Sequence, residues 1–364
     1  MHFVAGVDAH KDAHSVAFIN AVGTLVRSIT IAADVNGYET ALAAAQGLDG
    51  EVIWGLESTG CYARAFARLL LAKGFRVYEV PGSFTKRHRR RSSRAGKSDP
   101  LDAQAIAEAV LREAERLPLY ETATECEALR LRYDQRDRLV HQRTEAVNRL
   151  RSAALRLDRG VLPADVNTAQ AMESIERTIV KTRKESDPVI LALVDELRFA
   201  VEDIKRINAR IKEIEDLIRP IVRRLAPELL ELRGVSFVVA AGLIGHAGSL
   251  RNCRNADAFA MRAGTAPVNC SSGKHIAVRV NRGGNRKLNR LLHVIAVVQL
   301  SRPDYLGRVY YDRKRSEGMA ARAALRALKR RLTVVVYHRL LPAQRRCGQP
   351  SSESRATGLL KTAC

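Results

Sequence analysis

The sequence has few aromatic residues and few acids, and it contains no long apolar run. Aromatic side chains make up 5% of its 364 residues, with a single tryptophan. No apolar stretch approaches the roughly 20 residues that a membrane-spanning helix needs. The segment from Met1 to Asp12 also lacks the charged-then-apolar order of a signal peptide. We therefore expect no membrane span and no membrane partner.

Cysteine pairs at short spacing are also absent. None of the six cysteines forms a Cys-x-x-Cys pair, so the sequence indicates neither a zinc knuckle nor a disulfide framework. This pattern fits a reducing cytoplasm. The six are Cys61, Cys126, Cys253, Cys270, Cys347 and Cys364.

Positive charge is what the sequence has in excess. Its 61 Lys and Arg residues exceed its 39 Asp and Glu residues, which gives a formal net charge of +22. A field of this sign attracts polyanions, and without a membrane segment nucleic acid is the expected partner. The length predicts two or more domains, each with its own core.

Two segments concentrate this positive charge. Residues 279–346 hold eighteen Lys or Arg against three acids, with few aromatic residues between them, which favours contact with a nucleic-acid backbone over base stacking. Residues 86–97 contain no acid, and uncompensated charges at this density repel one another without a counter-ion. We expect nucleic acid to bind the seven basic residues of that segment: Lys86, Arg87, Arg89, Arg90, Arg91, Arg94 and Lys97.

The first 118 residues have the pattern of an α/β domain. The order β-β-β-α-β-α-β, followed by one more helix, is predicted by apolar runs and by turn and cap residues between them. The expected strands cover residues 3–7, 15–19, 25–31, 52–56 and 75–80, and the last two helices cover about 62–72 and 99–111.

Four acids occupy distinctive positions in this order. Asp8 ends the first strand, Glu57 follows the fourth, and Asp99 and Asp102 lie on one face of the last helix. An RNase-H-like fold gathers acids from such positions, and Mg²⁺ prefers carboxylate oxygens. The alternative is that all four are ordinary turn and capping acids.

Residues 119–224 predict long helices. Apolar residues recur there at three-, four- and seven-residue steps, which is typical of helix-to-helix seams. We interpret the region as a helical hairpin or coiled coil that spaces two catalytic parts and supports oligomerisation, with a self-contained helical bundle as the alternative. The seams are Leu129, Tyr133, Val140, Val147, Leu150, Ala154 and Leu157, then Ile190, Val194, Leu197, Val201 and Ile204, then Ile207, Ile211, Ile214, Ile218 and Ile221.

From residue 225 to 343 the sequence predicts a second compact and mostly helical part. The stretch from Leu232 to Gly245 resembles a helix-hairpin-helix element, which presents backbone N–H groups to DNA phosphate, although small-residue helices also pack this way in ordinary cores. Later helices are expected at about 286–300 and 320–340. Residues 344–364 are expected to form a flexible tail.

A second chemical centre is suggested between these helices. Ser271 and Ser272 precede Gly273 and Lys274, and a run from Arg282 to Arg286 follows. A serine hydroxyl can attack phosphorus when its proton is removed and nearby cations neutralise the phosphate. By itself, Ser-Ser-Gly is more often a simple loop.

In combination, these motifs resemble the insertion-sequence 110 family of DEDD transposases. The resemblance rests on Gly6–Asp12, Glu57–Tyr62 and Lys97–Ala103, and on Ser272-Gly273-Lys274 followed by Arg282–Arg286. It implies an RNase-H-like metal-binding domain (1–118), a helical linker (119–224) and a C-terminal transposase domain (225–343). The four acids Asp8, Glu57, Asp99 and Asp102 would then hold Mg²⁺.

The resemblance also implies a mechanism and partners. Ser272, with Ser271 as the adjacent alternative, would attack a DNA phosphate and form a covalent phosphoserine. Expected partners are double-stranded DNA (element ends and target), a structured guide RNA encoded by the element, and further copies of the chain in a dimer or tetramer. The expected location is the bacterial cytoplasm, at the nucleoid. Phosphate charge would be neutralised by Lys11, Lys274, Arg282 and Arg286.

Two other functions fit parts of this pattern. One is a junction-resolving or other metal-dependent nuclease in which water attacks and Ser272 is structural. The other is a basic nucleic-acid-binding protein without catalysis, whose acids are structural. Dependence on metal and on the serine hydroxyl separates the three.

Overall fold

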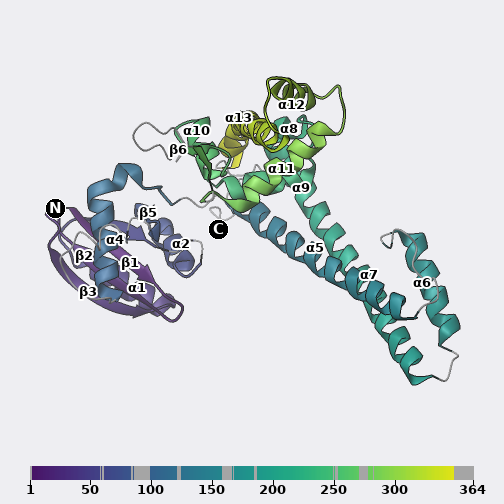
Figure 1. Ribbon diagram of the computed structural model, residues 1–364. Helices are drawn as coiled ribbons and strands as arrows, with labels where there is room; N and C mark the ends of the chain where they lie inside the picture. Colours follow the sequence, from purple (N-terminus) through teal and green to yellow (C-terminus); the bar gives the residue numbers. More distant parts are fainter. Residues whose placement is uncertain are drawn as a thin grey trace, which may run out of the picture. The chain divides into compact units, whose positions relative to one another are not determined.

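The chain folds into two compact units, Met1–Thr122 and Ala123–Cys364. They are drawn in Figure 1, which is a computed structural model. The structure describes residues 2–57, 59, 61–82, 85, 99–120, 124–157, 166, 168–183, 187–248, 250, 253–269, 278–281 and 283–347.

The N-terminal unit is built on a five-stranded mixed sheet with the strand order β3-β2-β1-β4-β5. The first three strands are antiparallel neighbours, and β4 and β5 run parallel to β1. The strands are β1 (His2–Ala9), β2 (Ala13–Ile19), β3 (Leu25–Ala32), β4 (Glu51–Leu56) and β5 (Val77–Glu79).

Helices cover both faces of this sheet. Side chains alternate along β1, so Phe3, Ala5 and Val7 share one core with α1 and α2, while Val4 packs with α4 on the other face. Burial on both faces explains why β1 reads as a continuous apolar run. The helices are α1 (Val35–Gln46), α2 (Arg64–Ala72) and α4 (Asp99–Glu113), the last continuing into the 3-10 turn η1 (Ala114–Arg116). These strands and helices follow the predicted order.

The C-terminal unit is mostly helical, as predicted. Its helices are α5 (Thr124–Leu157), α6 (Ala169–Thr182), α7 (Pro188–Leu225), α8 (Pro227–Leu230), α9 (Phe237–Ala247), α10 (Ala256–Arg262), α11 (Arg286–Leu300), α12 (Leu306–Ser316) and α13 (Ala321–Cys347). A two-stranded hairpin of β6 (Pro267–Asn269) and β7 (Val278–Val280) lies between α10 and α11 in the sequence.

The long helices α5 and α7 lie side by side (Figure 1). Arg136 pairs with Glu215, Arg149 with Asp203 and Arg156 with Glu196, at 2.6, 3.2 and 3.8 Å. Because positions late in α5 pair with positions early in α7, the two helices are antiparallel. Near their far end, Met172, Ile175 and Ile179 of α6 join the same core as α5 and α7. Supercoiling and a role in oligomerisation stay predictions.

The segment from Leu232 to Gly245, expected to resemble a helix-hairpin-helix element, begins with a turn and continues into α9, and the short helix α8 ends just before it. α8 is a single turn, and Gly234 has a φ of +94°, a left-handed conformation that favours glycine. α9 then begins after Ser236, whose hydroxyl accepts a hydrogen bond from the Val239 N–H at 3.3 Å. The helix-hairpin-helix motif and DNA contact there both stay predictions.

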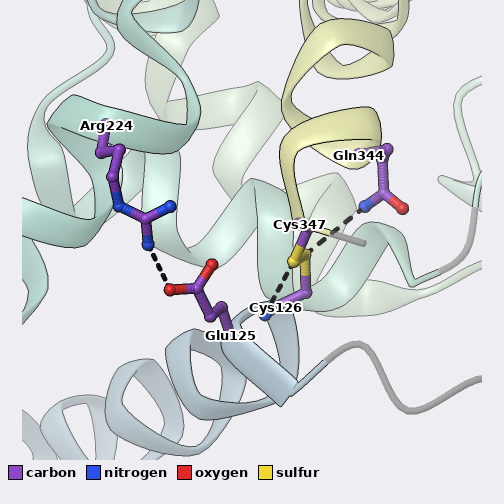
Figure 2. The surroundings of a disulfide bond; sticks show 5 residues. All are labelled: Glu125, Cys126, Arg224, Gln344 and Cys347. Atoms are coloured by element: carbon purple, nitrogen blue, oxygen red, sulfur yellow. Dashed lines mark hydrogen bonds and ion pairs between the residues drawn. A yellow bond between two sulfur atoms is a disulfide. The ribbon is translucent and has the colours of Figure 1, made fainter. Parts of the chain in front are cut away.

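A disulfide joins Cys126 near the start of α5 to Cys347 at the end of α13 (Figure 2). The expectation that cysteine spacing indicates no disulfide is therefore wrong. The two cysteines are 221 positions apart in sequence, and only helix packing brings their Cα atoms to 6.3 Å. Both are buried. α13 also continues through Cys347, so residues 344–347, which the sequence assigned to a flexible tail, are helical.

None of the helices described in the structure is long and apolar enough to cross a bilayer.

Candidate functional site

Two glycines fix the position of α4 on the N-terminal sheet. Gly6 of β1 and Gly55 of β4 are direct partners in the parallel register. A Cβ atom on Gly6 would lie 2.1 Å from the Ala103 carbonyl oxygen, and one on Gly55 would lie 2.4 Å from a methyl carbon of Val110. No side chain fits at either position, so α4 packs directly on the backbone of the two strands.

The same two strands place Asp8 and Glu57. In a strand, residues two positions apart face the same side of the sheet, so Asp8 follows Gly6 on the α4 side. Glu57 stands in the same relation to Gly55, and its backbone N–H donates to the Val7 carbonyl at 3.2 Å, which continues the pairing past the end of β4. Both carboxylates therefore emerge at neighbouring carboxyl ends of parallel strands.

The direction of α4 brings its first turn toward this end of the sheet. Ala103 lies over Gly6, whereas Leu111 lies near Gly23 in the β2–β3 turn, at 3.7 Å from the position of an added Cβ. That turn adjoins the amino end of β1, because Val4 pairs with Ile19. α4 consequently runs antiparallel to β1, and Asp102 directly precedes the residue that covers Gly6. Asp99 begins the helix, and its side chain lies outside the described residues.

The contacts of Asp8 and Glu57 differ. The Asp8 carboxylate lies 3.2 Å from His10 Nε2, with 14% of the Asp8 side chain exposed. The hydroxyl of buried Thr85 donates a 2.8 Å hydrogen bond to Glu57 Oε2. A Cβ on Gly82 would lie 2.8 Å from Glu57 Oε1. Thr85 therefore orients the Glu57 carboxylate and the missing side chain of Gly82 leaves room for it, and the sequence pattern gave no signal for either.

Within the described part of the chain, no group of three or more His, Cys, Asp or Glu residues forms a ready-made ion site. The donors near this sheet end are nevertheless carboxylate oxygens, the ligand type that Mg²⁺ prefers. His14 of β2 is a core residue: its ring stacks on Tyr38 with the centroids 5.7 Å apart, and burial lowers its pKa.

The serine centre is described only at its base. Ser271, Ser272, Lys274 and Arg282 lie outside the described residues, as does the basic segment 86–97. The hairpin strands β6 and β7 that flank the serines in sequence are paired from Pro267–Val280 to Asn269–Val278.

Side chains from neighbouring helices hold the base of this hairpin. The Asn289 amide donates to the carbonyls of Ala263 and Gly264 at 3.0 and 2.9 Å, and Thr333 of α13 bonds Thr265 at 2.9 Å. Lys329 of α13 donates to Asn289 Oδ1, and burial lowers the pKa of this lysine. The sequence prediction did not include these supporting residues.

Two of the predicted phosphate-neutralising residues lie within the described part. Lys11 is exposed in the turn between β1 and β2. Arg286 is exposed at the first position of α11, where the Asn285 side chain accepts hydrogen bonds from the Lys287 and Leu288 amides. Both are placed where a phosphate can approach from solvent.

Comparison with known proteins gives matches in both units. A family model described as a transposase matches residues 5–157, and a second, described as the IS116/IS110/IS902 transposase family, matches residues 226–312. A 44.8 kDa protein of insertion element IS116 from Streptomyces clavuligerus is 26% identical over 91% of this chain and 93% of its own. A 42 kDa protein of insertion element IS900 from Mycobacterium paratuberculosis is 28% identical over 92% and 94%.

Among solved structures, RuvC from T. thermophilus in complex with a Holliday junction substrate is similar at 13% identity. The similarity covers 33% of this chain and 100% of that chain, with a TM-score of 0.28.

Proposed function

We propose, since the chain belongs to the IS110/IS116 family of DEDD transposases, that it cleaves and rejoins DNA strands when its insertion element moves. The two family models match separate parts of the chain, and the relatives align over nearly its full length. Both parts are therefore expected to contribute to one activity.

We assign Asp8, Glu57, Asp99 and Asp102 as the ligands of Mg²⁺. The observation that carries this assignment is the seat of α4 on Gly6 and Gly55, which directs the first turn of α4 toward the ends of β1 and β4. When bound, Mg²⁺ polarises a phosphate oxygen and stabilises the charge that develops on it. The protein supplies fixed carboxylate oxygens, and Thr85 orients that of Glu57.

We assign Ser272 as the nucleophile, with Ser271 as the alternative. The serine oxygen forms a bond to the DNA phosphorus as it gives up its proton. The bond from phosphorus to one deoxyribose oxygen breaks, and that strand end takes up a proton and leaves as a hydroxyl. Because the phosphoserine conserves the phosphodiester, attack by another hydroxyl rejoins a strand without ATP. Lys11, Lys274, Arg282 and Arg286 neutralise phosphate charge.

The partners follow from the same assignment. We propose that the chain binds element ends and target as double-stranded DNA, and a structured RNA encoded by the element. It would act as a dimer or tetramer in the bacterial cytoplasm, at the nucleoid. The net charge of +22 supports polyanionic partners. A non-coding segment beside the gene that pairs with both element ends and target is the expected source of the RNA.

Trapping the covalent intermediate tests the serine. Wild-type protein incubated with element DNA and Mg²⁺ should give a protein–DNA adduct that survives denaturation, and Ser272→Ala should give none. Ser271→Ala is the matched control. An adduct of wild-type yield from Ser272→Ala would reject this nucleophile, and a metal-dependent nuclease would cleave with no adduct from either protein.

Replacing a carboxylate tests the metal assignment. Asp102→Asn should lower strand exchange about a thousand-fold, because it removes several kcal/mol of charge stabilisation, while DNA binding stays unchanged. In the same variant, the heat of Mg²⁺ binding measured by calorimetric titration should be smaller than in wild type. Asp49→Asn, an exposed acid at the opposite end of β4, is the control. Wild-type exchange by Asp102→Asn would favour the non-catalytic alternative.

A further inference from the structure

A cavity of about 540 Å³ lies in the C-terminal unit between α5, α7, α9 and α11. Its volume is within the range of pockets that bind small organic ligands. All of its lining residues belong to this one unit and lie outside the proposed catalytic groups. Neither the proposed Mg²⁺ ligands nor the serine motif lines this cavity, so the proposed catalytic chemistry gives it no role.

One wall of the cavity is apolar. Val140 of α5, Val238 of α9, and Leu291 and Val294 of α11 line it. Val294 is 41% exposed, so part of this wall is open to solvent. A flat apolar group would remove this surface from water, at a gain of roughly 25 cal/mol per Å² of buried area.

Three arginines also line the cavity, and they are not equivalent. The Arg136 guanidinium donates to Glu215 at 2.6 Å, and the Arg290 guanidinium is bonded to Asp137 and to the Tyr133 hydroxyl. The charges of Arg136 and Arg290 are therefore already balanced by carboxylates of α5 and α7.

Arg219 differs from these two. It is exposed, and within the described part of the chain it has no carboxylate partner. Its guanidinium lies over the ring of Phe237, 4.9 Å from the centroid, and that of Arg223 lies 5.5 Å from the same centroid. Stacking on an aromatic ring orients a guanidinium while leaving the N–H donors at its edge available to an anion.

Apolar lining residues together with an unpaired, oriented guanidinium suit a ligand with a flat apolar part and an anionic end. A nucleotide is such a ligand: its base is flat, and its phosphate is an ideal partner for arginine. In a paired duplex both faces of a base are covered by its neighbours, so only an unpaired nucleotide can enter.

We propose that this cavity binds one unpaired nucleotide of a nucleic-acid strand, with its base against the Val140–Val238–Val294 wall and its phosphate on Arg219. That the strand is nucleic acid rests on the proposed function. The cavity itself is distinct from the metal and serine centres. Single-stranded DNA and RNA share this chemistry, and the experiment separates them.

The experiment measures binding of the full-length chain to labelled strands by fluorescence anisotropy at several salt concentrations. The probes are oligothymidylate and oligouridylate of about 20 nucleotides, and a duplex of the same length. Arg219→Ala removes the unpaired charge. Arg210→Ala is its control, because Arg210 is also exposed on α7 but lies outside the cavity. Val294→Phe fills the cavity, and Val297→Phe adds the same group to an exposed position of α11 outside it.

Arg219→Ala should weaken single-strand binding about fivefold to tenfold and reduce the slope of log affinity against log salt by about 0.7. Val294→Phe should weaken it at least about threefold with the slope unchanged, because no charge is lost. Both control variants should bind within about twofold of wild type. The duplex affinity should not change with Val294→Phe. The tighter of the two single strands identifies the source of the nucleotide.

Several outcomes would overturn the proposal. Equal losses from Arg219→Ala and Arg210→Ala would mean that only general charge attracts the strand. Equal effects of Val294→Phe on single strand and duplex, or no effect on either, would exclude a base in the cavity. Circular dichroism of each variant identifies misfolding, and Val294→Ala, which removes part of the apolar lining without filling the cavity, should weaken single-strand binding less than Val294→Phe does.

The outcome is independent of the catalytic proposal. Asp102→Asn should bind the single strands as wild type does, since Asp102 belongs to the other unit. Loss of strand exchange in Asp102→Asn with normal nucleotide binding supports both proposals. If no covalent adduct forms but the cavity variants change single-strand binding as expected, the nucleotide site is supported and the serine assignment is rejected.

Discussion

The two units of this chain position their candidate functional groups in different ways. In the N-terminal unit, strand alternation and register place Asp8 and Glu57 on one face, two residues beyond the paired glycines. In the C-terminal unit, side chains from separate helices, such as Asn289 and Thr333, hold the base of the hairpin. The first arrangement is a property of local backbone geometry, whereas the second depends on contacts distant in sequence. This contrast explains why sequence patterns indicated the strand positions of Asp8 and Glu57 but not the groups that hold the hairpin.

The single tryptophan gives a means of following the units separately. Trp54 is fully buried in the sheet of the N-terminal unit, and most helix belongs to the C-terminal unit. Tryptophan fluorescence therefore reports unfolding of the first unit, and far-UV circular dichroism reports mainly the second.

The largest expected loss of stability comes from a change where α4 packs on the sheet. Gly6→Val should destabilise the N-terminal unit by about 3 kcal/mol, because its side chain would overlap the backbone of Ala103 and Ala107. The fluorescence midpoint in urea should fall while the dichroism midpoint changes little. Gly47→Ala, where an added Cβ meets only ordinary contacts at 3.6 Å, is the control. A parallel fall of both midpoints would mean that the two units unfold together.

The disulfide should have the next largest effect, in the other unit. Cys347→Ser, or reduction of the wild type, should lower the stability of the C-terminal unit by about 2–3 kcal/mol, because the bond restricts the unfolded chain. The dichroism midpoint should fall and the Trp54 transition should stay in place. Cys61→Ser, at an exposed free cysteine, is the control. An unchanged dichroism midpoint in reductant would show that the bond contributes no stability.

A smaller effect is expected from the support of Glu57. Thr85→Val keeps the shape of the side chain but removes its hydrogen bond to Oε2, so strand exchange should fall about tenfold without loss of folding. Thr40→Val removes a comparable hydroxyl, which bonds a backbone carbonyl on the exposed side of α1, and should leave exchange unchanged. If both variants exchange strands as wild type does, the orientation of Glu57 does not depend on Thr85.

The smallest effect is a pH dependence of stability in both units. Burial lowers the pKa of His246, against the raising effect of Asp134, with Lys287 and Arg130 lowering it further; burial likewise lowers the pKa of His14. Below about pH 6.5 the unfolded chain therefore binds protons more readily than the folded chain. Stability should be complete above this pH and decrease as the pH falls through it.

Urea titrations at pH values above and below about 6.5 measure this dependence. His246→Gln should reduce it in the dichroism transition alone and leave the Trp54 transition as in wild type. A dichroism midpoint that rises on acidification would contradict the direction of the His246 shift.

Helices and strands were predicted correctly where a hydrophobic period or a turn residue marks them in the sequence. The order of strands and helices in the N-terminal unit follows from apolar runs, and α11 spans residues 286–300 as predicted. Reasoning failed where partners are distant: Cys126 and Cys347, Thr85 and Glu57, and Lys329 and Asn289 have no local pattern that pairs them. The end of α13 was set too early: Pro342 is a residue type that usually ends a helix, yet α13 continues through it, and its last turn is joined to α5 by the disulfide.

The amino-acid sequence by itself determined the basic charge, the order of strands and helices in the N-terminal unit, the long helices of the other unit and the acids that end β1 and follow β4, because composition and hydrophobic period act over a few residues. Tertiary structure alone decided which glycines face α4, which cysteines join, and where four helices leave a cavity beside Arg219. These features arise when segments far apart in the chain pack at close distance, and packing depends on the shapes of both surfaces at once.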